Sequence, residues 1–137
     1  MNGYKIVADT NILISAVLAE GIARDFLRLS RKRQVDFVGS KWIFQELENV
    51  LRKKFNYPET DIIEIIDTFT SFITIIDVKN KYELKIKDIT DIPVLETALS
   101  AKADFLVTGD KGLLALQKVG GTEIVSLREI LNKLIAL

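Results

Sequence analysis

Two aspartates stand where strands of a folded α/β chain would end. Asp9 directly follows the apolar run 6–8, and Asp110 follows the apolar run 105–107 after a Thr-Gly pair. Runs of this length and composition are typical of buried strands. The carboxyl ends of parallel strands meet at one edge of a sheet, where ligands bind. We therefore expect Asp9 and Asp110 to lie at the same edge.

Two further acids are candidates for that site. Asp91 precedes an Ile-Pro pair that is typical of a helix entrance, in a connection that must return to the same edge. Glu46 lies on the row Trp42–Glu46–Val50 beside the apolar stripe of a predicted helix. Converging carboxylates repel one another, so some must take up protons unless a cation neutralises them.

The composition restricts the chemistry that such a site can perform. The 137 residues include no histidine and no cysteine, which excludes imidazole bases, histidine-based triads, thiolate nucleophiles, zinc–thiolate sites and disulfides. A metal bound here would have oxygen ligands, which suit Mg²⁺, Mn²⁺ or Ca²⁺. The matching chemistry is phosphodiester hydrolysis, in which one or two divalent ions acidify a water and stabilise charge on the scissile phosphate.

Each of these residues also has an ordinary structural interpretation. An aspartate at any of the three positions 9, 91 and 110 can simply cap a helix, and Glu46 can be a surface glutamate. Three neighbouring polar residues also fit ordinary turns: Thr10, Asn11 and Thr108. Spacing and composition alone predict an α/β domain with a candidate acidic metal site.

Short apolar runs alternate with amphipathic segments along the chain, which favours βαβ units. Strands are predicted at 4–8, 35–38, 74–78, 104–107 and 123–125. Helices are predicted at 11–18, 22–33, 41–54, 59–73, 92–102, 111–118 and 127–137, with a loop or irregular edge at 79–87. The fold class is therefore α/β, a three-layer sandwich with a central parallel sheet, and residues 1–137 are expected to form a single domain.

Charge is distributed unevenly along a chain whose formal net charge is zero. Nine basic residues and four acids between Arg24 and Lys54 give a balance of +5, and nine acids and four lysines between Phe55 and Ala101 give −5. A one-sided basic surface attracts phosphates, although solvated helix faces produce the same pattern. Neither a signal peptide nor an apolar stretch of membrane-spanning length is present, so we expect a soluble, cytoplasmic protein.

Three segments in order carry a family resemblance. They are DTNILISAVL at the first strand end, the helix that holds Glu46, and DIPVLETALSAKADFLVTGDKGLL from Asp91 to Leu114. Together they resemble a PIN-domain nuclease over residues 6–114, and the last segment is the most specific. The closest branch is similar to the VapC-like toxins of toxin–antitoxin systems.

The resemblance implies a PIN-like fold and a Mg²⁺- or Mn²⁺-dependent endoribonuclease. It also implies frequent homodimers and, in toxin members, inhibition by a small antitoxin protein. Carried over by position, the acids that hold the metal and perform catalysis are Asp9, Glu46, Asp91 and Asp110, with Glu48 as the competitor for Glu46. Residues expected to support them are Asn11, Thr108, Asp88 and Glu96.

Two other functions remain open from the sequence. One is a catalytically silent PIN-fold module that binds RNA or a protein. The other is a phosphotransfer or receiver-like domain that uses Asp9 as nucleophile or phosphate acceptor. The second is disfavoured because Asn11 stands where phosphatases of that class require another aspartate, and because the glycine-rich phosphate-binding loops are missing.

Overall fold

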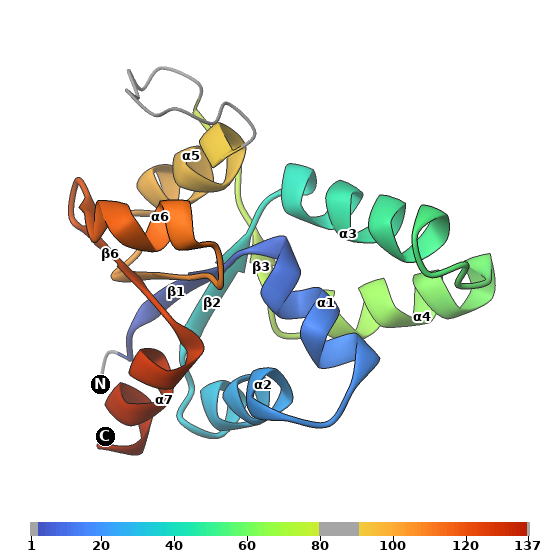
Figure 1. The fold of residues 1–137 in the computed structure, drawn as a ribbon, viewed down its shortest axis with the longest axis horizontal. Coiled ribbons are helices and arrows are strands. Elements are labelled where there is room, and N and C mark those ends of the chain that lie inside the picture. Colours follow the sequence, from blue (N-terminus) through green and yellow to red (C-terminus); the bar gives the residue numbers. More distant parts are fainter. Residues whose placement is uncertain (1–2, 80–90, 137) are drawn as a thin grey trace.

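A six-stranded, mostly parallel sheet lies at the centre of the chain (Figure 1). The structure is a computed structural model that describes residues 3–79 and 91–136. The spatial order of the strands is β3 (Thr74–Ile75), β2 (Asp36–Gly39), β1 (Lys5–Ala8), β4 (Phe105–Val107), β6 (Thr122–Val125) and β5 (Lys118–Val119). All neighbours pair in parallel except β5 and β6, which are antiparallel.

Helices cover both faces of this sheet (Figure 1). In chain order they are α1 (Thr10–Leu18), α2 (Ile22–Lys32), α3 (Lys41–Lys53), α4 (Glu59–Thr70), α5 (Ile92–Ala101), α6 (Lys111–Leu116) and α7 (Leu127–Ile135). The helices α1, α2 and α7 lie on one face and α5 and α6 on the other, while α3 and α4 extend sideways beyond β3. The predicted α/β architecture with a central parallel sheet is therefore confirmed.

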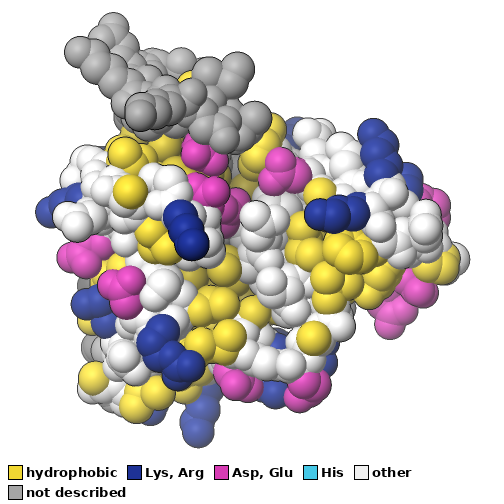
Figure 2. Space-filling model, in the orientation of Figure 1, with side chains coloured by type: hydrophobic (Ala, Val, Ile, Leu, Met, Phe, Trp, Pro, Cys, Tyr) yellow, Lys and Arg dark blue, Asp and Glu magenta, His cyan; other side chains and the backbone are white. Residues whose placement is uncertain are grey.

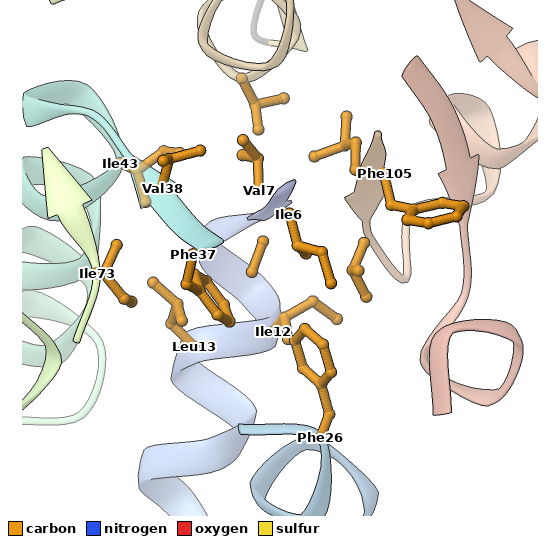
Figure 3. Close-up of a cluster of buried hydrophobic side chains, with 14 of the residues drawn as sticks. Ile6, Val7, Ile12, Leu13, Phe26, Phe37, Val38, Ile43, Ile73 and Phe105 are labelled. Carbon is orange, nitrogen blue, oxygen red and sulfur yellow. The ribbon is translucent and has the colours of Figure 1, made fainter. Parts of the chain in front are cut away.

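The central strands are buried on both faces, as their continuous apolar runs predict. Ile6 and Val7 in β1 have no exposed surface. Figure 3 shows Ile6 directed toward Ile12 and Phe26, and Val7 on the opposite side of the strand. Alternate residues of β1 thus pack against α1 and α2 on one face of the sheet and against α5 on the other. This packing on both faces holds β1, and with it the position of Asp9 at its carboxyl end.

Several elements differ from the sequence-based expectation, and among them the predicted helix 59–73 ends at Thr70. The predicted helix 111–118 ends at Leu116, because Gln117 takes a φ of 63° that an α-helix cannot accommodate. The chain then forms β5, turns at Gly120, whose φ is 58°, and pairs antiparallel with β6. The predicted strand 74–78 is shorter than expected and consists of Thr74–Ile75.

The remaining expectations concern the loop and the membrane. Of the predicted loop 79–87, only Lys79 is among the described residues. Within the ranges 3–79 and 91–136, no helix is both long enough and apolar enough to cross a membrane.

Strand register determines which residues meet at the carboxyl edge. Ala8 pairs with Val107, so Asp9 and Thr108 are the next residues on two adjacent strands. The Asp9 N–H donates to the Val107 carbonyl over 2.9 Å, and the Thr108 N–H donates to the Val125 carbonyl over 3.0 Å. These bonds hold the residues after β1, β4 and β6 side by side at the edge where we expect the site.

Candidate active site

Asp9 and Asp110 are linked at this edge through the hydroxyl of Thr108. The Thr108 hydroxyl donates to Asp9 Oδ2 over 2.8 Å, and Thr108 Oγ1 accepts from the backbone N–H of Asp110 over 3.1 Å. The other oxygen of Asp9, Oδ1, accepts from the N–H of Thr10 over 2.8 Å. Thr108 is fully buried, so the threonine is a fixed link between two strand ends and not a surface turn residue.

The environment of Asp9 disfavours its negative charge. Only 9% of the residue is exposed, and this burial raises the pKa of its carboxyl above the ordinary value. The hydrogen bonds from Thr108 and Thr10 lower that pKa, while the negative charge of Asp110 raises it further. A buried carboxylate beside a second acid is the kind of group that a cation stabilises.

Asp110 has a capping role as well as its place beside Asp9. It is the N-cap of α6, and its Oδ2 accepts from the N–H of Leu113 over 2.8 Å. A Cβ added at Gly112 would lie 3.1 Å from that oxygen, so glycine leaves room for the carboxylate. The capping interpretation of Asp110 is therefore correct.

Asp91 and Glu46 lie on helices that flank this edge. Asp91 is the N-cap residue of α5, but its side chain makes no hydrogen bond to the first turn of that helix. Glu46 is half-buried in α3. Its competitor Glu48 acts on a different group, because its charge raises the pKa of Arg52, which pairs with Glu59. Both glutamates are half-buried, so burial does not separate them, and the choice of Glu46 stays a prediction.

The supporting residues are distributed differently from the acids. Asn11 is exposed in the first turn of α1. Because α1 begins at Thr10, both Thr10 and Asn11 are helical residues. Asp88 lies outside the described residues. Glu96 is half-buried, and on an ideal helix a residue five positions after Asp91 points about 140° away from it. Glu96 lines a cavity between α3, α5 and the segment that follows β3.

Carboxylate chemistry fits a hard divalent cation at this edge, but a complete ligand set is not assembled in the described part of the chain. Figure 2 shows acidic side chains gathered where α5 and α6 approach the start of α3. Among residues 3–79 and 91–136, however, no three acidic side chains lie close enough together to hold a metal ion. The described contacts bring Asp9 and Asp110 together.

Four of the nine basic residues between Arg24 and Lys54 are engaged by other groups. Arg24 and Arg28 both bind Glu20, at 2.8 Å and 3.0 Å. Arg31 stacks over the Phe72 ring, 4.8 Å from its centroid. Arg52 binds Glu59 through two nitrogens, at 2.7 Å and 2.8 Å. The basic balance of the sequence therefore overstates the number of cations that are available to a ligand.

Sequence reasoning missed a buried polar contact next to this edge. The hydroxyl of Thr97 in α5 donates to Ser40 Oγ over 2.9 Å, and both residues are buried. Ser40 is also the N-cap of α3, because its Oγ accepts from the Ile43 N–H. Nothing in the local sequence pairs residues that are 57 positions apart.

The comparison with known families gives one match. The model of the PIN domain family matches residues 5–112, which include β1, the strand-end residues Asp9, Thr108 and Asp110, and the helices α3 and α5. No curated protein matches the chain at a significant level.

Proposed function

This chain belongs to the PIN domain family, and we therefore propose that it is a divalent-metal-dependent endoribonuclease. PIN domains are usually nucleases, so hydrolase chemistry on nucleic acid follows from the family at that coarse level. The single observation that best supports the finer proposal is the Asp9–Thr108–Asp110 arrangement. It places a buried carboxylate with a raised pKa beside a second acid at the carboxyl edge of the sheet.

The proposed metal ligands are Asp9, Glu46, Asp91 and Asp110. Bound Mg²⁺ or Mn²⁺ would supply positive charge beside the scissile phosphate and acidify the attacking water. The chain's own contribution is orientation: Thr108 and the Thr10 N–H fix both oxygens of Asp9, and the Leu113 N–H fixes Oδ2 of Asp110. Asn11 and Asp88 are proposed to support the acids.

The proposed reaction is hydrolysis of an RNA phosphodiester bond. A water oxygen attacks phosphorus in line with the bond to the 3′ oxygen, that bond breaks, and the 3′ oxygen takes a proton. The products are a 5′-phosphate and a 3′-hydroxyl. Since every atom comes from RNA and water, no redox partner or second substrate is required.

The biological role proposed here is that of a toxin in a toxin–antitoxin pair, acting in the cytoplasm. Support comes from the resemblance of residues 6–114 to VapC-like toxins. The same resemblance supports a homodimer and a small antitoxin partner. A pull-down from the native host, followed by sizing of the complex, tests both partners.

The decisive experiment is RNA cleavage with Mg²⁺, with Mn²⁺ and with excess chelator. We expect cleavage only when metal is present. Asp9→Asn should reduce the cleavage rate by more than about 100-fold, because mutation of residues that merely orient metal ligands already lowers metal affinity by about 10–100-fold. Asp67→Asn is the matched control, since Asp67 is exposed on α4. Cleavage that survives chelator, or that Asp9→Asn leaves intact, would refute the proposal.

The alternative is a catalytically silent PIN-fold module that binds RNA or a protein. It is favoured by the lack, among residues 3–79 and 91–136, of three acids close enough to hold a metal. Calorimetric titration with Mn²⁺ separates the two functions. Binding that Asp9→Asn weakens supports the nuclease, whereas no binding at millimolar Mn²⁺ supports the silent module.

A further inference from the structure

A cavity of about 330 Å³ opens between α3, α5 and the segment that follows β3. Its lining includes Lys41 and Trp42 from the first turn of α3, and Glu96 from α5. Two of its lining residues lie close in the chain to proposed metal ligands. Trp42 is one helical turn before Glu46 on the same row of α3. Pro93, also in the lining, is two residues after Asp91.

Hydrogen bonds fix the walls of this cavity. The segment after β3 is held at one end by the Ile76 N–H, which donates to the Gly39 carbonyl over 3.0 Å. At the other end, the Lys79 N–H donates to Ser100 Oγ of α5 over 2.9 Å. The buried Thr97–Ser40 hydrogen bond ties α5 to the start of α3. The cavity is therefore held open by the fold, and a ligand would not have to order it.

The polar groups of the cavity lining are the Trp42 ring, the carboxylates of Glu96 and Asp77, the Lys41 ammonium, and the hydroxyls of Ser40 and Thr97. Trp42 and Glu96 are half-buried, while Lys41 is exposed at the rim. With the other described residues, neither Lys41 nor Glu96 forms an ion pair within 4.0 Å. Both charges thus remain available to a ligand that presents donors to Glu96 and negative charge to Lys41.

We propose that this cavity binds a guanine base of single-stranded RNA next to the scissile phosphate, an inference that rests on the proposed ribonuclease function. Single-stranded RNA is read by stacking bases on aromatic side chains and by hydrogen bonds to their Watson–Crick edges. Trp42 supplies the stacking surface. Lys41 contacts a flanking phosphate, which positions the strand without reading its sequence.

Glu96 gives the cavity its preference for guanine. An ionised carboxylate offers only acceptors, on two oxygens. Guanine presents two adjacent donors, N1–H and the 2-amino group, and so matches both oxygens. Adenine and cytosine present an acceptor beside their amino group, and uracil presents one donor between two carbonyls, so each places an acceptor against the carboxylate.

Trp42 makes the proposal directly measurable, because it is the only tryptophan in the chain. Base stacking on it should quench its fluorescence. The probes are the pentaribonucleotides UUGUU, UUAUU and UUIUU, in which inosine lacks the 2-amino group, titrated in chelator so that nothing is cleaved. We expect UUGUU to bind about 5- to 150-fold more tightly than UUAUU, the range for one bidentate base contact, with UUIUU between them.

Two glutamate variants decide whether Glu96 reads the base. In Glu96→Gln the guanine preference should fall to below about twofold, because an amide nitrogen replaces one acceptor. Glu123→Gln, an exposed glutamate on β6, should retain the full preference. Equal binding of UUGUU and UUAUU to the parent protein, or an unchanged preference in Glu96→Gln, would overturn the proposal.

The failure of this proposal can be told apart from the failure of the proposed function. Guanine-selective quenching without any metal-dependent cleavage would support the proposed base site and refute the proposed nuclease function. Metal-dependent cleavage with no quenching by any pentanucleotide would support the proposed nuclease function and refute the proposed base site. When cleavage is present, mapping the cut sites gives an independent result: cuts should lie beside guanines, and Glu96→Gln should remove that preference.

Discussion

The hydroxyl of Thr108 donates to Asp9 Oδ2 over 2.8 Å, although the two residues are 99 positions apart in the chain. The same oxygen of Thr108 accepts from the Asp110 N–H over 3.1 Å. One buried side chain therefore sets the orientation of one proposed metal ligand and the backbone position of another. This arrangement makes Thr108 a positioning residue whose removal should be measurable in metal binding.

Thr108→Val should lower Mn²⁺ affinity by about 10–100-fold, the range for residues that orient metal ligands. Valine retains the shape of threonine but leaves Asp9 Oδ2 without this donor, at a cost to folding of about 1–3 kcal/mol for a buried unpaired group. Thr108→Ser, which retains the hydroxyl, is the control and should retain most of the affinity. Calorimetry measures both variants, and equal losses would contradict the role of the hydroxyl.

The raised pKa of Asp9 predicts how metal-free stability depends on pH. The folded protein holds this proton to higher pH than the unfolded chain does, so the associated stability is fully present below the unfolded pKa of about 3.9. It is lost as pH rises through the folded pKa. We therefore expect the parent protein to lose more stability than Asp9→Asn as pH rises above about 4.

Urea unfolding in chelator across that pH range measures this difference. Asp67→Asn, which removes an exposed carboxylate from α4, should follow the parent protein. Adding Mn²⁺ should stabilise the parent at neutral pH and not Asp9→Asn, because a ligand that binds only the folded state stabilises it. Parallel stability curves for the parent and Asp9→Asn would refute the prediction.

Glu46→Gln and Glu48→Gln should separate the two candidate acids of α3. Glu48 acts electrostatically on Arg52, so its neutralisation should leave cleavage near the parent rate. Glu46→Gln should reduce cleavage by more than about 10-fold. Loss of a residue that only orients a metal ligand already reduces activity by about 10-fold or more, and loss of a ligand should cost at least as much. Metal-dependent RNA cleavage measures both, and the opposite ranking would assign the helix acid to Glu48.

Salt dependence of RNA binding should identify which basic helix contacts the backbone. Lys32 ends α2 near the start of β2, at the edge opposite the acids. Lys53 ends α3, which begins at the carboxyl end of β2 and extends outward from there (Figure 1). Lys53→Gln should reduce the slope of log affinity against log salt by about 0.7, the value for one phosphate contact on a single strand.

Lys32→Gln is the matched control, because both lysines are exposed and both end a helix. It should leave the slope unchanged. Fluorescence anisotropy with a labelled RNA at several salt concentrations gives both slopes. A reduced slope for Lys32→Gln alone would place the RNA on the α2 side.

Local sequence by itself determined the elements that carry the site. The continuous apolar runs before Asp9 and Asp110 are typical of central strands that are buried on both faces. Asp91 before Ile92-Pro93 is typical of a helix start. Strand ends and helix starts depend on nearest neighbours, so their positions and the α/β architecture could be predicted. The same locality explains why the sequence left cap and ligand roles open for each acid.

Tertiary structure alone decided which of these residues meet. Strand register brought Thr108 to Asp9, and packing of α5 on α3 paired Thr97 with Ser40. The arrangement of α5 beside α3 placed Glu96 and Trp42 in the lining of one cavity. Such contacts join residues 57 to 99 positions apart, and their geometry arises from the collective packing of the core rather than from any local pattern of side chains.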